Sequence, residues 1–118
     1  MRKLLVANRG EIAARVFATC GRLGIATVAV TAPDERGAFH ARRADEVVEI
    51  GSYLDPSEHL RAAAETGADA IHPGYGFLAE RADFADAVEA AGLVFVGPAG
   101  DALRRGGDKL EAKRAARA

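Results

Sequence analysis

Short apolar runs alternate with longer segments of helical periodicity along this chain. Five of the apolar runs have the length of a strand that is buried in a sheet, and they cover residues 3–7, 26–31, 47–50, 68–71 and 93–96. The segments between them predict helices over residues 11–23, 38–44, 56–66 and 81–91. In the first of these helices the apolar residues recur at the spacing of one helix face, at positions 12, 13, 16, 17, 20 and 23.

The residues at the ends of these segments support the same division. Gly24, Gly67 and Gly92 each follow a helical segment, as a C-terminal cap does. The run Asp55-Pro56-Ser57-Glu58 predicts a helix start, with Asp55 as the cap, proline at the first helical position and Glu58 closing a capping box. Alternating strands and helices predict an α/β fold, a Rossmann-like open parallel sheet of about five strands with helices on both faces.

Composition narrows the class of protein without naming a function. The 118 residues are enough for one domain, and a net charge of −1 gives no support for a nucleic-acid or anionic-membrane partner. No apolar run approaches the roughly 20 residues of a membrane span, and Asn8, Arg9 and Glu11 interrupt any signal-peptide core. Cys20, the single cysteine, lies at helical spacing among apolar residues and is expected to be buried and inert. We expect a cytoplasmic protein.

The last residues differ from the rest. Residues 99–105 suggest a helical turn, Gly106-Gly107 a hinge, and residues 108–111 a second capping box. The helix that would follow holds Leu110 as its single large apolar residue, so it has no apolar face to dock. We therefore expect a domain over residues 1–103, and a linker with a truncated first helix over 104–118 that leads to a missing domain.

Two loops with unusual residues leave strand ends that this fold places together. In the strand order 3-2-1-4-5, strands one and four flank the switch point, where ligands of open parallel sheets bind. The first loop, Asn8-Arg9-Gly10-Glu11, has one glycine and so lacks a dinucleotide-binding fingerprint. Arg9 has two interpretations of equal weight: it binds a carboxylate or phosphate beside a helix N-terminus, or it pairs with Glu11 or Glu80 to hold loops together.

The second loop, residues 72–80, carries two aromatic residues between glycines. Gly74 and Gly76 permit positive φ or close backbone approach, and Pro73 stiffens the entry. We expect the Tyr75 ring to face a ligand and Phe77 to face the core. His72 is expected to serve backbone groups at the strand end.

Other candidate groups give weaker signals. Lys109 either reaches a nucleotide phosphate or is an ordinary first-turn lysine, and the residues around it favour the second. His40 and His59 are expected on the surface. No spacing of His, Cys, Asp and Glu indicates a metal site, and no complete catalytic centre is apparent.

Several motifs together resemble those of biotin carboxylases, in the same order along the chain. They are ANRGEIA at residues 7–13, ADE at 44–46, GADAIHPGYGFL at 67–78, GP at 97–98 and GDK at 107–109. The resemblance covers essentially the whole chain and points to the amino-terminal domain that precedes the ATP-grasp domain of the family. Such enzymes use ATP and bicarbonate to make carboxyphosphate, and they then carboxylate a ureido nitrogen of biotin held on a carrier protein or domain.

The resemblance implies roles for individual residues. Lys109 matches a lysine that contacts ATP phosphates, so the resemblance favours the phosphate contact over the ordinary first-turn lysine. Tyr75 and Gly76 match the loop that lies against biotin. Other residues of the two loops would support this site: Asn8, Arg9, Gly10, Glu11, His72, Gly74 and Phe77. The catalytic groups and the ligands for Mg²⁺ or Mn²⁺ lie in later domains of the family, so the fragment alone is expected to be inactive.

The resemblance also implies partners, and the chain departs from the family at some positions. The implied partners are a biotin carboxyl carrier, a carboxyltransferase subunit and a second copy in a homodimer. Ala18 and Arg22 stand where some bacterial members have charged dimer contacts, and Ala79 and Arg81 stand where the family usually has Ser and Asn. Two alternatives remain, namely the front domain of another ATP-grasp ligase such as a carbamoyl-phosphate synthetase, and a stand-alone binding or scaffold module.

Overall fold

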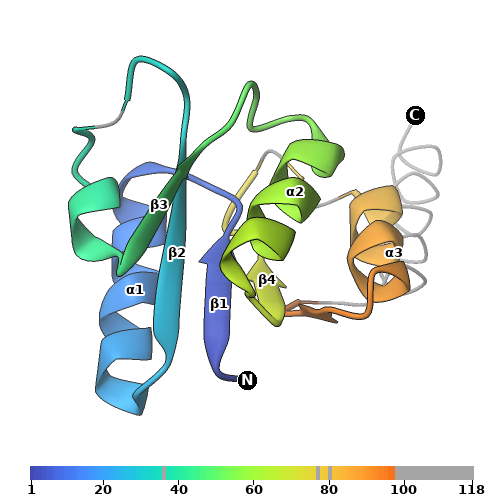
Figure 1. Ribbon diagram of the computed structural model, residues 1–118, viewed down its shortest axis with the longest axis horizontal. Coiled ribbons are helices and arrows are strands. Elements are labelled where there is room, and N and C mark those ends of the chain that lie inside the picture. Colours follow the sequence, from blue (N-terminus) through green and yellow to red (C-terminus); the bar gives the residue numbers. More distant parts are fainter. Residues whose placement is uncertain (36, 77, 80, 98–118) are drawn as a thin grey trace, which may run out of the picture.

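The chain forms an open sheet with helices on both of its faces (Figure 1). The structure is a computed structural model, and it describes residues 1–35, 37–76, 78–79 and 81–97. The strands are β1 (Lys3–Val6), β2 (Ala26–Thr31), β3 (Glu46–Glu49), β4 (Ala70–His72) and β5 (Val94–Phe95). The helices are α1 (Gly10–Leu23), α2 (Pro56–Thr66), α3 (Ala82–Ala90) and the 3-10 helix η1 (Ala41–Arg43).

The strands pair in the order β3-β2-β1-β4-β5, and every pair is parallel. This confirms the predicted fold class and strand order. β1 lies in the middle, with Val6 opposite Ala29 of β2 on one side and His72 of β4 on the other. Because the chain turns in opposite directions from β1 and from β4, the switch point lies between the carboxyl ends of these two strands.

Alternate residues of β1 enter separate cores on the two faces of the sheet. Leu5 belongs to the larger core, which includes Ala62 of α2 and Phe84 of α3. Leu4 and Val6 belong to the smaller core, which α1 covers. Cys20 of α1 is buried in that smaller core, which confirms the expectation of a buried cysteine, and burial raises the pKa of its thiol. Within the described residues, no helix is long and apolar enough to cross a bilayer.

The ends of α1 and α2 follow the sequence signals with one exception. Gly24 and Gly67 close these helices in the left-handed region, as predicted. The Asp55 carboxylate caps α2 and accepts a hydrogen bond from the Ser57 amide at 3.0 Å. The predicted capping box is wrong, because the Glu58 carboxylate accepts instead from the Gly51 N–H at 2.6 Å. Glu58 therefore ties the start of α2 to the end of β3.

Two histidines expected on the surface are buried, so that expectation was wrong. His59 of α2 is fully buried, with its Nε2 2.8 Å from the Tyr53 carbonyl oxygen and its ring edge-on to Phe84. His40 is also buried, with its Nε2 2.9 Å from the carbonyl oxygen of Val30. The segment before β3 is correspondingly less regular than predicted, since only the three residues of η1 are helical there.

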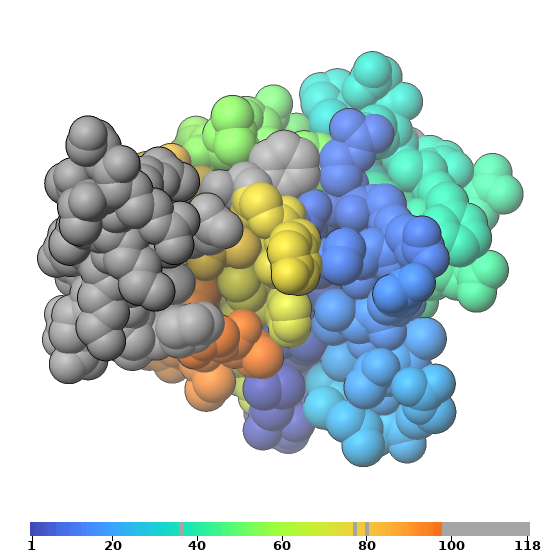
Figure 2. Space-filling model, turned by 180° about the vertical axis from the view of Figure 1, so that it is seen from behind, coloured from blue at the N-terminus to red at the C-terminus, as the bar shows by residue number. Residues whose placement is uncertain are grey.

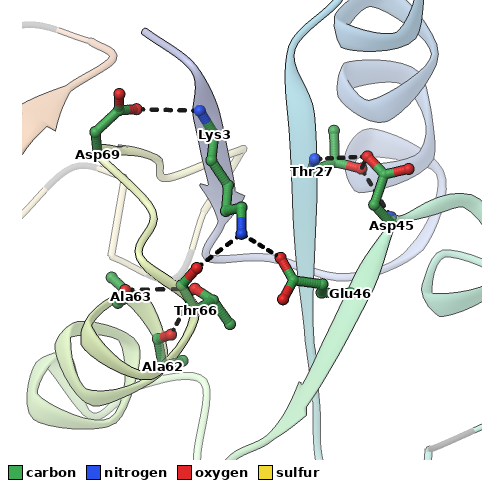
Figure 3. Close-up of polar contacts among 8 residues, drawn as sticks. All are labelled: Lys3, Thr27, Asp45, Glu46, Ala62, Ala63, Thr66 and Asp69. Carbon is green, nitrogen blue, oxygen red and sulfur yellow. Dashed lines mark hydrogen bonds and ion pairs between the residues drawn. The ribbon is translucent and has the colours of Figure 1, made fainter.

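Polar contacts close the amino-terminal end of the sheet, opposite the switch point (Figure 3). The Lys3 side chain donates to the Thr66 carbonyl at 2.7 Å and pairs with Glu46 at 2.6 Å, so it joins β1 to the end of α2 and to β3. The Asp69 carboxylate accepts from the backbone amides of Arg2 and Lys3, and these bonds lower its pKa. The loops that follow β1 and β4 lie at the opposite end of the sheet from these polar contacts.

Candidate functional site

The loops that follow β1 and β4 lie side by side at the carboxyl edge of the sheet. The Ala7 amide donates to the His72 carbonyl at 2.8 Å, so the parallel pairing continues one residue beyond β1. In Figure 2 the yellow surface of the segment after β4 lies beside the blue surface of the chain that leads into α1. The two segments that the sequence singled out are therefore neighbours at the switch point.

Asn8 connects these two loops directly. The residue is 4% exposed, and its side-chain amide nitrogen donates to the carbonyl oxygens of Pro73 at 3.1 Å and of Tyr75 at 2.6 Å. Its side-chain oxygen accepts from the amide of Arg9 at 2.8 Å, at the N-cap position of α1. A single buried amide thus fixes the second loop against the start of α1.

The entry to the second loop is held by His72 and Gly74. The Gly74 amide donates to Nδ1 of His72 at 2.9 Å, so the histidine does serve a backbone group as expected. Burial lowers the pKa of His72, which favours the neutral ring that this acceptor role requires. Gly74 has φ +69°, and a Cβ at this position would lie 2.5 Å from Nδ2 of Asn8. The loop can therefore approach Asn8 this closely only with glycine at position 74.

Between two buried anchors the loop exposes its tip. Pro73 and Leu78 are buried, whereas Tyr75 is 80% exposed and Gly76, with φ +65°, is exposed beside it. The Tyr75 ring thus does not fill the bottom of a crevice in this structure. Phe77 lies outside the described residues.

Arg9 faces the β2 side of the first loop. Its guanidinium pairs with Glu35 at 2.7 Å, and not with Glu11, which pairs with Arg15 at 3.1 Å. The Arg9 and Glu35 pair lines a cavity of about 460 Å³ together with Tyr53. Burial and the Glu35 carboxylate raise the pKa of the Tyr53 hydroxyl to about 12. Gly10 begins α1, and the Glu11 side chain is exposed to solvent.

Some expected site residues are not described, and one contributor was missed. Lys109, Glu80 and the predicted linker over 104–118 lie outside the described residues. Among the residues that the structure does describe, no cluster of three or more His, Cys, Asp or Glu side chains could hold a metal ion. Glu35 was missed as the partner of Arg9. Its place just after β2 was the available signal, because the carboxyl ends of parallel strands meet at one edge.

Comparison with known proteins places this geometry in a family. A family model described as "Biotin carboxylase, N-terminal domain" matches residues 1–103. The chain is 57% identical to the alpha subunit of mitochondrial methylcrotonoyl-CoA carboxylase from Oryza sativa subsp. japonica, over 95% of this chain and 16% of that protein. It is 51% identical to a biotin carboxylase of Pseudomonas aeruginosa, over 98% of this chain and 27% of that protein.

Solved structures agree with the sequence comparison. The biotin carboxylase domain of a single-chain bacterial carboxylase superimposes with a TM-score of 0.90 at 49% identity, covering 99% of this chain and 29% of that one. This chain therefore spans less than a third of the length of the relatives named here. The family match also sets aside the front domain of a different ATP-grasp ligase. The chain belongs to the family of biotin carboxylase amino-terminal domains.

Proposed function

We propose that this chain supplies one wall of the biotin-binding crevice of an ATP-dependent biotin carboxylase. The observation that carries the proposal is the Tyr75 ring, exposed at the tip of a loop whose base is fixed at the switch point of the sheet. The full-length enzyme would convert ATP, bicarbonate and carrier-bound biotin into carboxybiotin. The described residues bind and orient in this scheme, and the chemical steps belong to residues beyond this chain.

The proposed roles follow the two loops. The face of the Tyr75 ring would lie against the planar ureido ring of biotin, and Gly76 would allow close approach beside it. Asn8, His72 and Gly74 would support this loop from below. Lys109 would contact ATP phosphates as a point charge, a role that rests on the resemblance alone. By the resemblance, the residues that would bind Mg²⁺ or Mn²⁺ belong to the later domains of the full-length enzyme.

The same proposal names partners and a location. A biotin carboxyl carrier, as a domain or a separate protein, would present biotin to this crevice, and a carboxyltransferase would consume the carboxybiotin. A homodimer of the full-length enzyme is part of the proposal. We place the enzyme in the cytoplasm, a reducing compartment that suits the free buried thiol of Cys20.

The test is steady-state kinetics of the full-length enzyme carrying Tyr75→Ala, with free biotin as the varied substrate. Loss of the ring should raise the KM for biotin roughly tenfold, because stacking of a planar ring on an aromatic side chain contributes on the order of 1 kcal/mol. The KM for ATP should change less than about twofold, because the ring has no proposed contact with the nucleotide.

Tyr75→Phe is the matched control, because it keeps the ring and removes only the hydroxyl. The KM for biotin in this variant should stay near that of the wild type. Equal increases in the KM values for biotin and ATP in Tyr75→Ala would exclude the stacking role. A full-length protein that releases no ADP when supplied with ATP, bicarbonate and biotin would exclude the carboxylase assignment.

A further inference from the structure

The position of the Tyr75 ring is set by its backbone. Because Tyr75 is 80% exposed, its ring gains little packing from the protein, so the contacts of the ring cannot hold it in one place. The carbonyl of the same residue, in contrast, accepts the 2.6 Å hydrogen bond from Asn8. What restrains the ring is thus the backbone on either side of it.

Asn8 is suited to this task because its amide group is fully used. Both hydrogens of the amide are donated to the second loop, one to the carbonyl of Pro73 and one to that of Tyr75. The oxygen accepts from the Arg9 amide. A flipped amide would set its oxygen against two carbonyl oxygens, so one orientation alone satisfies all three bonds. Buried at 4% exposure, these bonds face little competition from water.

No other side chain of similar size makes this set of bonds. Aspartate keeps the acceptor for the Arg9 amide but has no hydrogen to donate, and its charge would lie against two carbonyl oxygens. The absence of a Cβ at Gly74 supplies the remaining space, since such an atom would lie 2.6 Å from Cβ of Asn8. Asn8 and Gly74 therefore form one complementary contact beneath Tyr75.

From these contacts we propose that Asn8 is a positioning residue for biotin carboxylation, holding the Tyr75 ring where the biotin ring is to lie. In this role Asn8 touches no substrate and acts through the carbonyl groups of Pro73 and Tyr75. This inference rests on the proposed contact between Tyr75 and biotin. It adds that the contact depends on a buried amide 67 residues earlier in the chain.

The experiment is a double-mutant cycle in the full-length enzyme, with Asn8→Asp, Tyr75→Ala and the double variant assayed with free biotin. Asn8→Asp alone should lower kcat/KM for biotin about tenfold, the usual scale for losing a buried hydrogen bond, and should change the KM for ATP less than about twofold. In the Tyr75→Ala background the same substitution should lower kcat/KM less than about twofold, because there is no ring left to position.

Two further variants separate positioning from general damage. Asn8→Ala removes the same donors without adding charge and replaces Asn8→Asp in the cycle if the aspartate variant does not fold, which the melting temperature reports. Asp45→Asn is the control, an isosteric change in a loop contact with Thr27 at the other end of the sheet, and it should leave kcat/KM for biotin unchanged.

The outcomes distinguish the inference from the function on which it rests. An equal loss from Asn8→Asp in both backgrounds, or no loss while Tyr75→Ala is impaired, overturns the positioning role and leaves the biotin contact intact. If Tyr75→Ala leaves kcat/KM for biotin unchanged, the biotin contact itself is wrong, and the positioning role falls with it. A loss that is confined to the background with an intact ring supports both.

Discussion

The His59 ring shows how burial sets the behaviour of a single residue. Its Nε2 donates to the Tyr53 carbonyl, so Nδ1 is the unprotonated nitrogen, and in the described part of the chain it has no hydrogen-bond partner. Burial lowers the pKa of this ring below 6.5, more than the hydrogen bond to Tyr53 raises it. The folded protein therefore holds His59 neutral under conditions in which the unfolded chain would protonate it.

This environment predicts a pH dependence of stability. At pH 7.5 the ring is neutral in both the folded and the unfolded state, so its titration does not affect stability. Below pH 6.5 the ring is protonated in the unfolded state but stays neutral in the folded state. The free energy of unfolding should then fall by up to about 1.4 kcal/mol per pH unit until the pH reaches the folded-state pKa. Urea titrations at pH 7.5 and 5.5 measure this, and His59→Gln, which keeps a donor and cannot titrate, should lose less stability. An identical loss in both proteins would assign the effect to other groups.

Individual residues differ in how far the sequence predicts their place. Positions 59, 62 and 63 have the spacing of one helix face, so the pattern indicated that His59 is buried with Ala62 and Ala63. The expectation of a surface position came from the polarity of histidine. His40 gave no such signal, because its partner is the Val30 carbonyl on another element. The glycines on both sides of Tyr75 indicated a loop, but the hydrogen bonds that Asn8 donates to this loop depend on the pairing of β1 with β4 and could not be derived locally.

Most helix and strand bounds lie within one residue of the predicted ones, and the larger differences are at the start of β4 and in the segment 38–44, where only η1 is helical. β2 matches its predicted range, and α2 ends at Thr66 as predicted. β4 begins at Ala70 and not at residue 68, because the Ala68 amide is used to close α2 through the Ala63 carbonyl. β3 is shifted by one residue toward Glu46, which pairs opposite Val28. Strand bounds depend on partners in neighbouring strands, whereas helix bounds depend on the capping residues next to them in the sequence.

The start of α2 gives a prediction at the scale of one element. The Asp55 carboxylate accepts hydrogen bonds from the amide and hydroxyl of Ser57, and nothing replaces it in Asp55→Ala. This substitution should lower the free energy of unfolding by about 1 kcal/mol, the usual cost of losing an N-cap. Asp55→Asn keeps an accepting oxygen and should cost much less. Urea unfolding measures both, and equal stability of Asp55→Ala and the wild type would show that the cap is dispensable here.

For the molecule as a whole, the strand order determines where the site is supported. The order was predictable because alternating helices and strands with right-handed crossovers leave few topologies. It places β1 at the centre, with hydrogen-bonded neighbours on both sides. One of the two site loops follows β1, and the other follows the adjacent β4. The loop carrying Tyr75 is thus supported by the interior of the sheet, whereas β3 and β5 form its edges.

Native-state amide hydrogen exchange of the protein should follow this arrangement. Amides of Leu4 to Val6 are buried between two strands, so they should exchange only when the whole domain opens, with the largest free energies measured. Amides of β3, whose Val47 side chain is exposed at the edge, should exchange through local opening and so be less protected. The Tyr75 amide, at an exposed tip, should be faster still, while Ala7, bonded to His72, should behave like β1. Equal protection of β1 and β3 would mean that the sheet opens as one unit. The site would then have no support more stable than the edges of the sheet.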